Sequence, residues 1–116
     1  MADAPMTVVE TGEFLKHAKG LMTESEREAL IAFVGENPEA GQIIPETGGV
    51  RKIRWALAGM GRRGGARVIY YYHSPLLPLF LLPVYAKNRK TNVSKAECNE
   101  MKRLVPQLAT EYRRRA

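Results

Sequence analysis

The chain has 116 residues, of which 45% are hydrophobic, so it is long enough for one compact core and too short for a second. We therefore expect a single domain over residues 1–116. No apolar run approaches the roughly 20 residues that span a bilayer, and the N-terminus lacks the pattern of a signal peptide, so we expect a cytoplasmic protein with no membrane partner. The lone Cys98 cannot form an internal disulfide and has no Cys/His cluster around it, so we expect neither a metal site nor a cofactor.

The net charge of +6 is unevenly distributed along the chain. Residues 1–49 contain three Lys/Arg against nine Asp/Glu, a net charge of −6. Residues 50–116 contain fifteen Lys/Arg against three Asp/Glu, a net charge of +12. Charge separated in this way attracts polyanions such as nucleic acid, an acidic membrane or an acidic protein, and it does not choose among them.

The first third of the chain predicts a strand followed by two amphipathic helices. Residues 6–10 (MTVVE) are a β-branched run typical of a strand. Thr11 can cap a first helix, and Thr23 with Glu26 forms a Thr-x-x-Glu capping box at the start of a second. Gly35 is typical of the end of that second helix.

The middle of the chain changes to the period of two that is typical of strands. Residues 41–49 read as a loop, and strands are expected over residues 50–56, 66–73 and 79–86. A glycine-rich turn, GMGRRGG, joins the first two of these strands. The three strands should form an antiparallel meander.

A final helix should begin with a second capping box, formed by Ser94 and Glu97, and Pro106 should kink or interrupt it. The predicted order is therefore β-α-α-β-β-β-α, an α+β fold built on an antiparallel sheet. Two helices would cover one face of the sheet, and the other face would stay open and basic, available for function.

Four cations from the meander fall on the predicted open face by alternation: Lys52, Arg54, Arg67 and Lys87. Neighbouring strands lie about 4.8 Å apart, so these side chains could converge on an object the size of a phosphate. No acidic residue lies within the meander to neutralise them. The alternative interpretation is a solvated surface, which is the more common state of any one such side chain.

A basic face of this kind suggests chemistry on RNA. The C-terminal half has no GKS/GKT phosphate loop, HExxH motif or paired carboxylates, which argues against an NTPase or a metal-dependent nuclease. The 2′-hydroxyl of RNA can itself attack the adjacent phosphate, if the protein aligns the backbone, stabilises the extra negative charge and moves two protons. Arginine suits the charge because its guanidinium forks onto phosphate oxygens, and lysine crowded by other cations suits proton transfer.

Three sequence blocks carry a family resemblance: TGGVRKIRWAL, GGARVIYYY and LLPVYAKN, all between Thr47 and Asn88. They closely resemble the signature blocks of HigB-type toxins in the RelE/ParE superfamily of type II toxin–antitoxin systems, and the flanking elements match in order. The resemblance implies a RelE-like fold and an mRNA interferase, an endoribonuclease that cleaves mRNA in the ribosomal A site without a metal and inhibits translation. It also implies a cognate antitoxin, and binding to operator DNA through the toxin–antitoxin complex.

The resemblance also implies roles for individual residues. The four cations of the basic face would bind phosphate and stabilise the transition state, with Lys52 or Lys87 handling a proton. RelE uses a tyrosine beyond the last strand to stack on the base, but Val93 stands in that region here, so Tyr85 is the substitute candidate. Further RNA contacts are predicted at Arg51, Arg62, Arg63, Tyr71, Arg89 and Lys90.

Two other functions stay open: a ParE-like, non-catalytic inhibitor of DNA gyrase, and an inactive relative that only binds RNA or an antitoxin. The convergent cations favour the ribonuclease, because cutting requires them and gyrase binding does not. We also expect the antitoxin to offer an acidic, partly disordered segment to the basic face and to Arg62 and Arg63.

Overall fold

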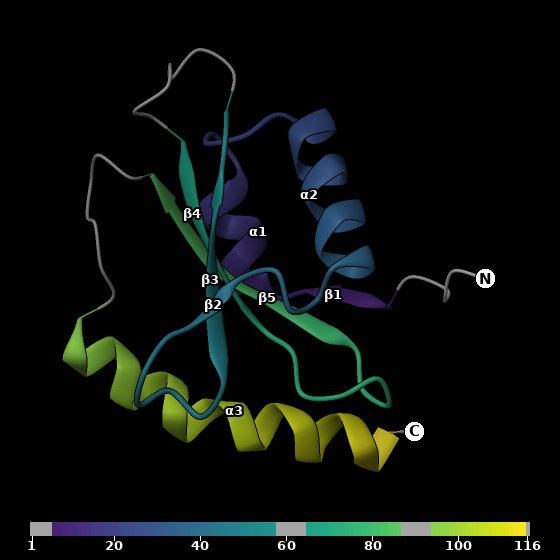
Figure 1. The fold of residues 1–116 in the computed structure, drawn as a ribbon, viewed down its shortest axis with the longest axis vertical. Coiled ribbons are helices and arrows are strands. Elements are labelled where there is room, and N and C mark those ends of the chain that lie inside the picture. Colours follow the sequence, from purple (N-terminus) through teal and green to yellow (C-terminus); the bar gives the residue numbers. More distant parts are fainter. Residues whose placement is uncertain (1–5, 58–64, 87–93, 116) are drawn as a thin grey trace.

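The computed structural model describes residues 6–57, 65–86 and 94–115, which form three helices and a five-stranded sheet (Figure 1). The elements follow one another as β1 (Val8–Glu10), α1 (Gly12–Ala18), α2 (Glu24–Glu36), β2 (Gln42–Ile43), β3 (Val50–Trp55), β4 (Ala66–Tyr71), β5 (Leu79–Ala86) and α3 (Lys95–Arg115). The predicted α+β class is confirmed. Each predicted helix and strand is present, and the predicted loop before β3 contains one additional short strand, β2.

Side-chain caps fix where the first two helices begin. The Thr11 hydroxyl accepts a hydrogen bond from the backbone N–H of Phe14 at 3.3 Å, at the start of α1. At the start of α2 the predicted capping box is closed in both directions. The Thr23 N–H donates to the Glu26 carboxylate at 2.8 Å, and the Glu26 N–H donates to the Thr23 hydroxyl at 3.1 Å.

The predicted capping box of α3 is also confirmed, with hydrogen bonds of 3.0 and 3.1 Å between Ser94 and Glu97. Pro106 was expected to kink or interrupt this helix, and it does not interrupt it, because α3 continues through it. Proline removes only one N–H from the helix, and the buried Val105 and Ala109 on either side of it hold both halves against the sheet. Within the described part of the chain, no helix is long and apolar enough to cross a membrane.

The sheet has the strand order β1-β5-β4-β3-β2. Strands β3, β4 and β5 form the predicted antiparallel meander. The prediction of an antiparallel sheet is wrong at β1, which pairs with β5 in parallel, with Val9 opposite Phe80. Alternation along a strand looks the same in either direction, so the sequence pattern could not distinguish parallel from antiparallel pairing here.

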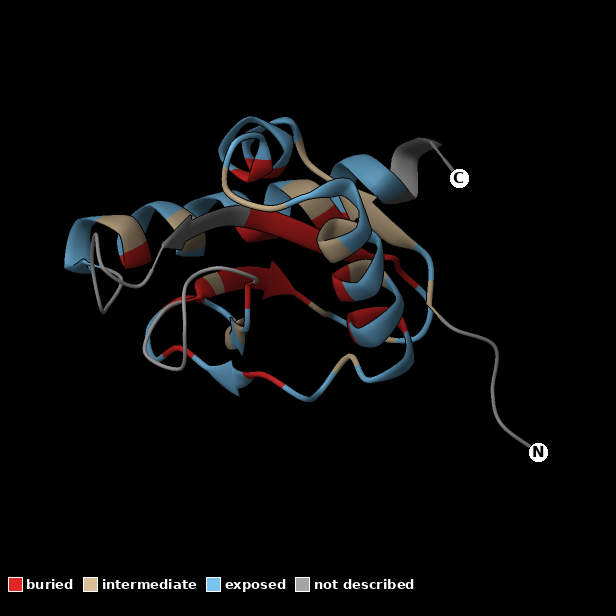
Figure 2. Cartoon of the chain, turned by 90° about the horizontal axis from the view of Figure 1, so that it is seen from above, coloured by how far each residue is buried: buried red, intermediate tan, exposed pale blue. Residues whose placement is uncertain are grey.

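Helices lie on both faces of this sheet: two cover one face, as expected, but the face that was expected to stay open is partly covered by α3. Helices α1 and α2 pack on one face, where Phe14 and Leu30 meet Val68 and Tyr70. Helix α3 packs on the other face, through a second cluster of buried residues: Ile44, Val50, Ile69, Tyr71, Phe80, Leu82, Cys98 and Val105. Buried residues accordingly gather on the strands between the helices (Figure 2).

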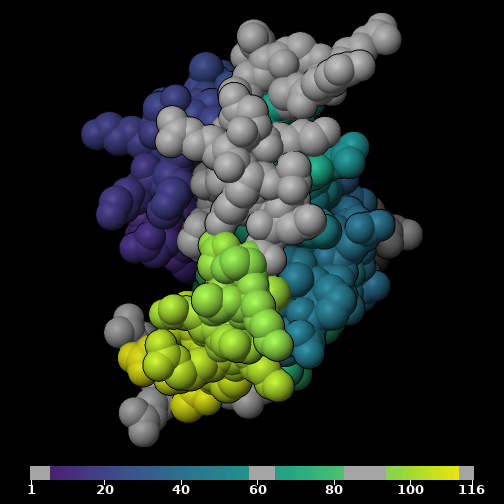
Figure 3. All heavy atoms as spheres, turned by 90° about the vertical axis from the view of Figure 1, so that its left-hand side faces the viewer, coloured from purple at the N-terminus to yellow at the C-terminus, as the bar shows by residue number. Residues whose placement is uncertain are grey.

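Helix α3 covers only one end of that second face. Its cluster draws on the start of β3 and the end of β4, at Val50 and Tyr71, and on no residue from the opposite ends of those two strands. Figures 1 and 3 show α3 low on the molecule, and Figure 1 shows β3 leaving the sheet at the opposite end. The basic face is thus divided into a covered half and a half beyond α3.

A bulge in β5 changes the alternation of that strand. Val68 pairs with Val84, whereas Tyr70 pairs with Leu81, so β5 has one residue more than β4 between these pairs. The extra residue lies at Leu82 or Pro83, and proline has no N–H to contribute to the ladder. Phe80 and Leu82 therefore pack under α3, while Val84 is registered with Val68 of the other cluster.

Candidate functional site

The register of the meander places three predicted site residues in one line across the sheet. Arg54 on β3 is opposite Arg67 on β4, and Arg67 is opposite Tyr85 on β5. Directly opposed residues of antiparallel strands share a face and have Cβ atoms about 5 Å apart. We call Arg54, Arg67 and Tyr85 the cross-strand row. Lys52 lies two residues from Arg54 on β3, opposite Ile69, and is therefore on the same face.

The bulge in β5 is what completes the cross-strand row. With unbroken alternation from Leu82, which lies under α3, position 85 would fall on the opposite face of the sheet. The additional residue shifts the register by one, so that Tyr85 is opposite Arg67. Bulges are common beside functional sites.

The cations of this site have no partner in the described part of the chain. Arg54 is exposed, and Lys52 and Arg67 are half-buried. Among residues 6–57, 65–86 and 94–115, none forms a hydrogen bond or an ion pair with these three side chains. Two arginines directly opposite each other in a sheet repel, which destabilises the fold unless an anion lies between them. The arrangement is therefore suited to binding a phosphate.

Arg51 has a different environment, although it lies between Val50 and Lys52 on the same strand. Its guanidinium Nη1 donates to the carbonyl oxygens of Glu39 at 3.2 Å and Gly41 at 2.8 Å. Alternation places it on the face of α1 and α2, away from the cross-strand row. The structure thus separates Arg51 from Lys52, Arg54 and Arg67 and gives it local hydrogen-bond partners.

Hydrogen bonds from Tyr70 also hold residues 38–41, the segment to which Arg51 donates, beside Lys52. The Tyr70 hydroxyl accepts a hydrogen bond from the Gly41 N–H at 2.7 Å and donates one to the Pro38 carbonyl at 2.9 Å. Burial raises the pKa of this phenol, while the Gly41 hydrogen bond opposes the rise. A Cβ at position 41 would lie 2.8 Å from both the Lys52 carbonyl oxygen and the Tyr70 hydroxyl, so only glycine fits. Through this packing, β2 lies against β3, with Gln42 opposite Lys52.

Tyr71 is not brought to the site. It is 4% exposed and packs in the cluster beneath α3, with its hydroxyl 2.9 Å from Nδ1 of His73. Its ring therefore has no open face on which a base could stack. The sequence of α3 contains a signal for the burial of Tyr71. Cys98, Val105 and Ala109 recur at helical spacing and predict an apolar stripe on this helix, which needs an apolar surface to pack against.

The remaining predicted residues cannot be placed. Arg62, Arg63, Lys87, Arg89 and Lys90 lie outside the described residues, as does the side chain of Tyr85. As for metal ligands, no group of three or more His, Cys, Asp or Glu residues gathers within residues 6–57, 65–86 and 94–115.

Comparison with known proteins gives consistent results for family and fold. The model of the family described as the RelE toxin of the RelE / RelB toxin-antitoxin system matches residues 6–114. Among solved structures, the chain is similar to a mutant of the E. coli toxin RelE in the free state, with 18% sequence identity and a TM-score of 0.54. That similarity covers 75% of this chain and 88% of the RelE chain, and it shows a shared fold. Because the family match spans nearly the whole chain, this protein belongs to the family of RelE toxins of toxin–antitoxin systems.

Proposed function

We propose that this protein is a HigB-type toxin of a type II toxin–antitoxin system, and that it inhibits translation by cleaving mRNA in the ribosomal A site without a metal ion. The observation that carries the proposal is the cross-strand row. Arg54 and Arg67 are opposite each other, with Tyr85 next in line and Lys52 beside them. Membership of the RelE family supports the class of activity, and the cations without partners supply the chemistry.

The reaction is a transfer within the RNA. The 2′-hydroxyl oxygen attacks the adjacent phosphorus, the new O–P bond forms, and the bond from phosphorus to the 5′ oxygen of the next nucleotide breaks. The products are a cyclic phosphate and a free 5′-hydroxyl. One proton must leave the attacking hydroxyl and one must reach the leaving oxygen, while negative charge accumulates on the non-bridging oxygens.

Each member of the site has a proposed role in that reaction. Arg54 and Arg67 hold the non-bridging oxygens, because guanidinium groups stay charged and offer paired donors to phosphate. A lysine, Lys52 or Lys87, transfers a proton, and Tyr85 orients the nucleotide. Removing one donor to a developing oxyanion typically slows a reaction by about 100- to 1,000-fold, which sets the effect expected for either arginine.

The proposed partners follow from the same charge. The ribosome with its mRNA presents the phosphate backbone, and a cognate antitoxin would neutralise the basic face with an acidic segment. Operator DNA would be bound through the toxin–antitoxin complex. The unpaired cations beyond α3 support a polyanionic partner for this half of the face.

The test is cleavage of mRNA on programmed ribosomes, mapped by primer extension. Wild-type protein should produce cuts in the A-site codon, and Arg67→Ala should reduce them at least about 100-fold. Lys16→Ala is the matched control, because it removes one exposed cation from α1 on the other side of the sheet and should cut like wild type.

Two results would contradict the proposal in different ways. Absence of A-site cuts by wild-type protein would reject the ribonuclease, and inhibition of gyrase supercoiling by the same sample would then favour the ParE-like alternative. Equal cutting by Arg67→Ala would instead reject the assignment of the cross-strand row.

A further inference from the structure

Gln42 on β2 extends the candidate site by one strand. The register places it opposite Lys52, so the two side chains share the face of the cross-strand row. Arg54 lies two residues farther along β3, which makes Gln42 and Arg54 diagonal neighbours, about 7–8 Å apart between their Cα atoms. The site thus spans four strands, with Tyr85 on β5 at one side of the two arginines and Gln42 on β2 at the other.

The backbone beside Gln42 is held in place, whereas its side chain is exposed. Gly41 donates its N–H to the Tyr70 hydroxyl at 2.7 Å, and its carbonyl oxygen accepts from Arg51 at 2.8 Å. A Cβ on Gly41 would lie only 2.8 Å from the Lys52 carbonyl oxygen, which shows how closely this segment approaches β3. Among the residues that the structure describes, the Gln42 amide has no hydrogen-bond partner. A fixed backbone that carries an unused donor and acceptor is suited to recognising a ligand.

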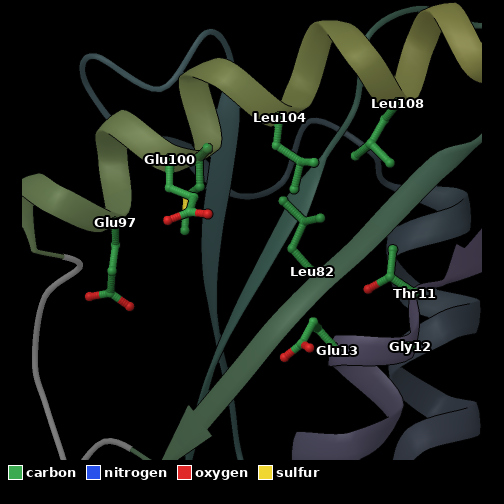
Figure 4. A pocket seen from close by; sticks show the side chains of 9 residues that line it. Thr11, Gly12, Glu13, Leu82, Glu97, Glu100, Leu104 and Leu108 are labelled. Carbon is green, nitrogen blue, oxygen red and sulfur yellow. The ribbon is translucent and has the colours of Figure 1, made fainter.

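The opposite side of the site is less suited to a phosphate backbone. A hollow of about 590 Å³ lies there between β5, α3 and the start of α1. Figure 4 shows the side chains of Glu13, Glu97 and Glu100 extending toward its open space, and no lysine or arginine is among the described residues that line it. Carboxylates repel phosphate, so an RNA strand held by Arg54 and Arg67 is favoured to continue toward β2 and away from this hollow.

We infer that Gln42 recognises a base of the cleaved codon and favours adenine. The inference rests on the proposed cleavage of mRNA and assigns a base preference to the same site. Bases of single-stranded RNA are recognised along both their Watson–Crick and their Hoogsteen edges. The glutamine amide offers one donor and one acceptor side by side. Adenine presents the complementary pair on both edges, whereas guanine and the pyrimidines present it on the Watson–Crick edge alone.

The test is single-turnover cleavage on ribosomes programmed with mRNAs in which each base of the A-site codon is varied in turn. At one codon position, wild-type protein should cut the adenine codon at least about fivefold faster than the guanine codon, the smallest effect expected of a good bidentate contact. Gln42→Met keeps the length of the side chain and removes its hydrogen bonds, so it should abolish this preference. Gln42→Arg should reverse it, because a guanidinium donates to the O6 and N7 acceptors of guanine.

Ile43→Thr is the matched control. Ile43 is the other residue of β2, is 56% exposed and lies opposite Arg51, so it points away from the site. This variant should keep the wild-type ratio of adenine to guanine cleavage.

The outcomes separate this inference from the function on which it rests. Absence of cuts by wild-type protein would reject the proposed function and the inference together. Cuts by wild-type protein without a preference for adenine, or a preference that Gln42→Met retains, would overturn the inference alone. An equal loss of cleavage by Gln42→Met at every codon would also overturn it, because a structural role or general RNA binding would slow all codons alike.

Discussion

Arginines on the two faces of this sheet have opposite surroundings. On the side of α1 and α2, Arg27 is paired with the Glu10 carboxylate, and Arg51 donates to two backbone carbonyls. Beyond α3 on the other face, Arg54 and Arg67 are opposite each other and have no partner in the described part of the chain. Arg27 and Arg51, which stabilise the fold, thus have hydrogen-bond partners within the chain. Arginines held together against their mutual repulsion are better explained by a ligand than by stability.

The largest expected effect tests whether the two arginines of the cross-strand row act on one phosphate. Arg54→Ala and Arg67→Ala should each slow single-turnover cleavage by about 100- to 1,000-fold. If both hold the same developing charge, the double variant should lose far less than the product of the two losses, because residues that act as a unit are not additive. Losses that multiply in the double variant would show that the two arginines bind different groups of the RNA.

A smaller effect, on stability, is expected for substitution of Tyr70, which anchors residues 38–41, the segment to which Arg51 also donates. Tyr70→Phe leaves the buried Gly41 N–H without its acceptor and should lower the free energy of unfolding by about 1–3 kcal/mol. Urea unfolding followed by circular dichroism measures this loss. An unchanged midpoint would show that the two hydrogen bonds of the phenol do not hold the segment.

The contribution of the Tyr70 phenol to the free energy of unfolding should depend on pH. Burial raises the pKa of Tyr70, so the folded protein holds the proton more tightly than the unfolded chain, in which tyrosine titrates near pH 10. Its contribution to stability is therefore complete below about pH 10 and is lost as the pH rises further. Tyr70→Phe should flatten the alkaline decline in the free energy of unfolding, and an equally steep decline would contradict this.

The smallest loss of stability is expected at Arg51, the arginine with partners. Arg51→Ala removes the hydrogen bonds to the Glu39 and Gly41 carbonyls, and should cost about 0.5–1.5 kcal/mol in the free energy of unfolding. Cleavage per folded molecule should fall much less than for Arg54→Ala. Arg103→Ala, which breaks an exposed pair with Glu100, is the control and should cost less than about 1 kcal/mol. If Arg51→Ala instead lost as much cleavage as Arg54→Ala, Arg51 would have to act on the RNA.

Local patterns in the sequence predicted most elements of the fold. The capping boxes and the period-two strands appear where they were expected, because both depend on residues a few positions apart. What could not be predicted depends on contacts between distant segments. The parallel pairing of β1 and the packing of α3 on the second face leave no mark in the periodicity of either segment alone.

The part of the candidate site that depends on local alternation was also predictable from the sequence. Alternation along β3 and β4 predicted that Lys52, Arg54 and Arg67 share a face, and the register agrees. Tyr85 was predicted from the family resemblance, as the substitute for the RelE tyrosine, and unbroken alternation from Leu82 would place it on the other face. The bulge at Leu82 or Pro83 is what places it opposite Arg67. A single-residue bulge is invisible to a count of alternating residues, although a proline within a strand is a cue to look for one.

We propose that the cations of the cross-strand row serve a ligand at the expense of stability. The direct measurement is single-turnover cleavage together with urea unfolding of Arg54→Thr, since Arg54 is exposed and threonine is well suited to a strand. Cleavage should fall at least about 100-fold, while the free energy of unfolding should stay the same or rise by about 0.2–1 kcal/mol as the repulsion with Arg67 is removed. Retained cleavage with reduced stability would contradict this proposal, because Arg54 would then be a structural residue.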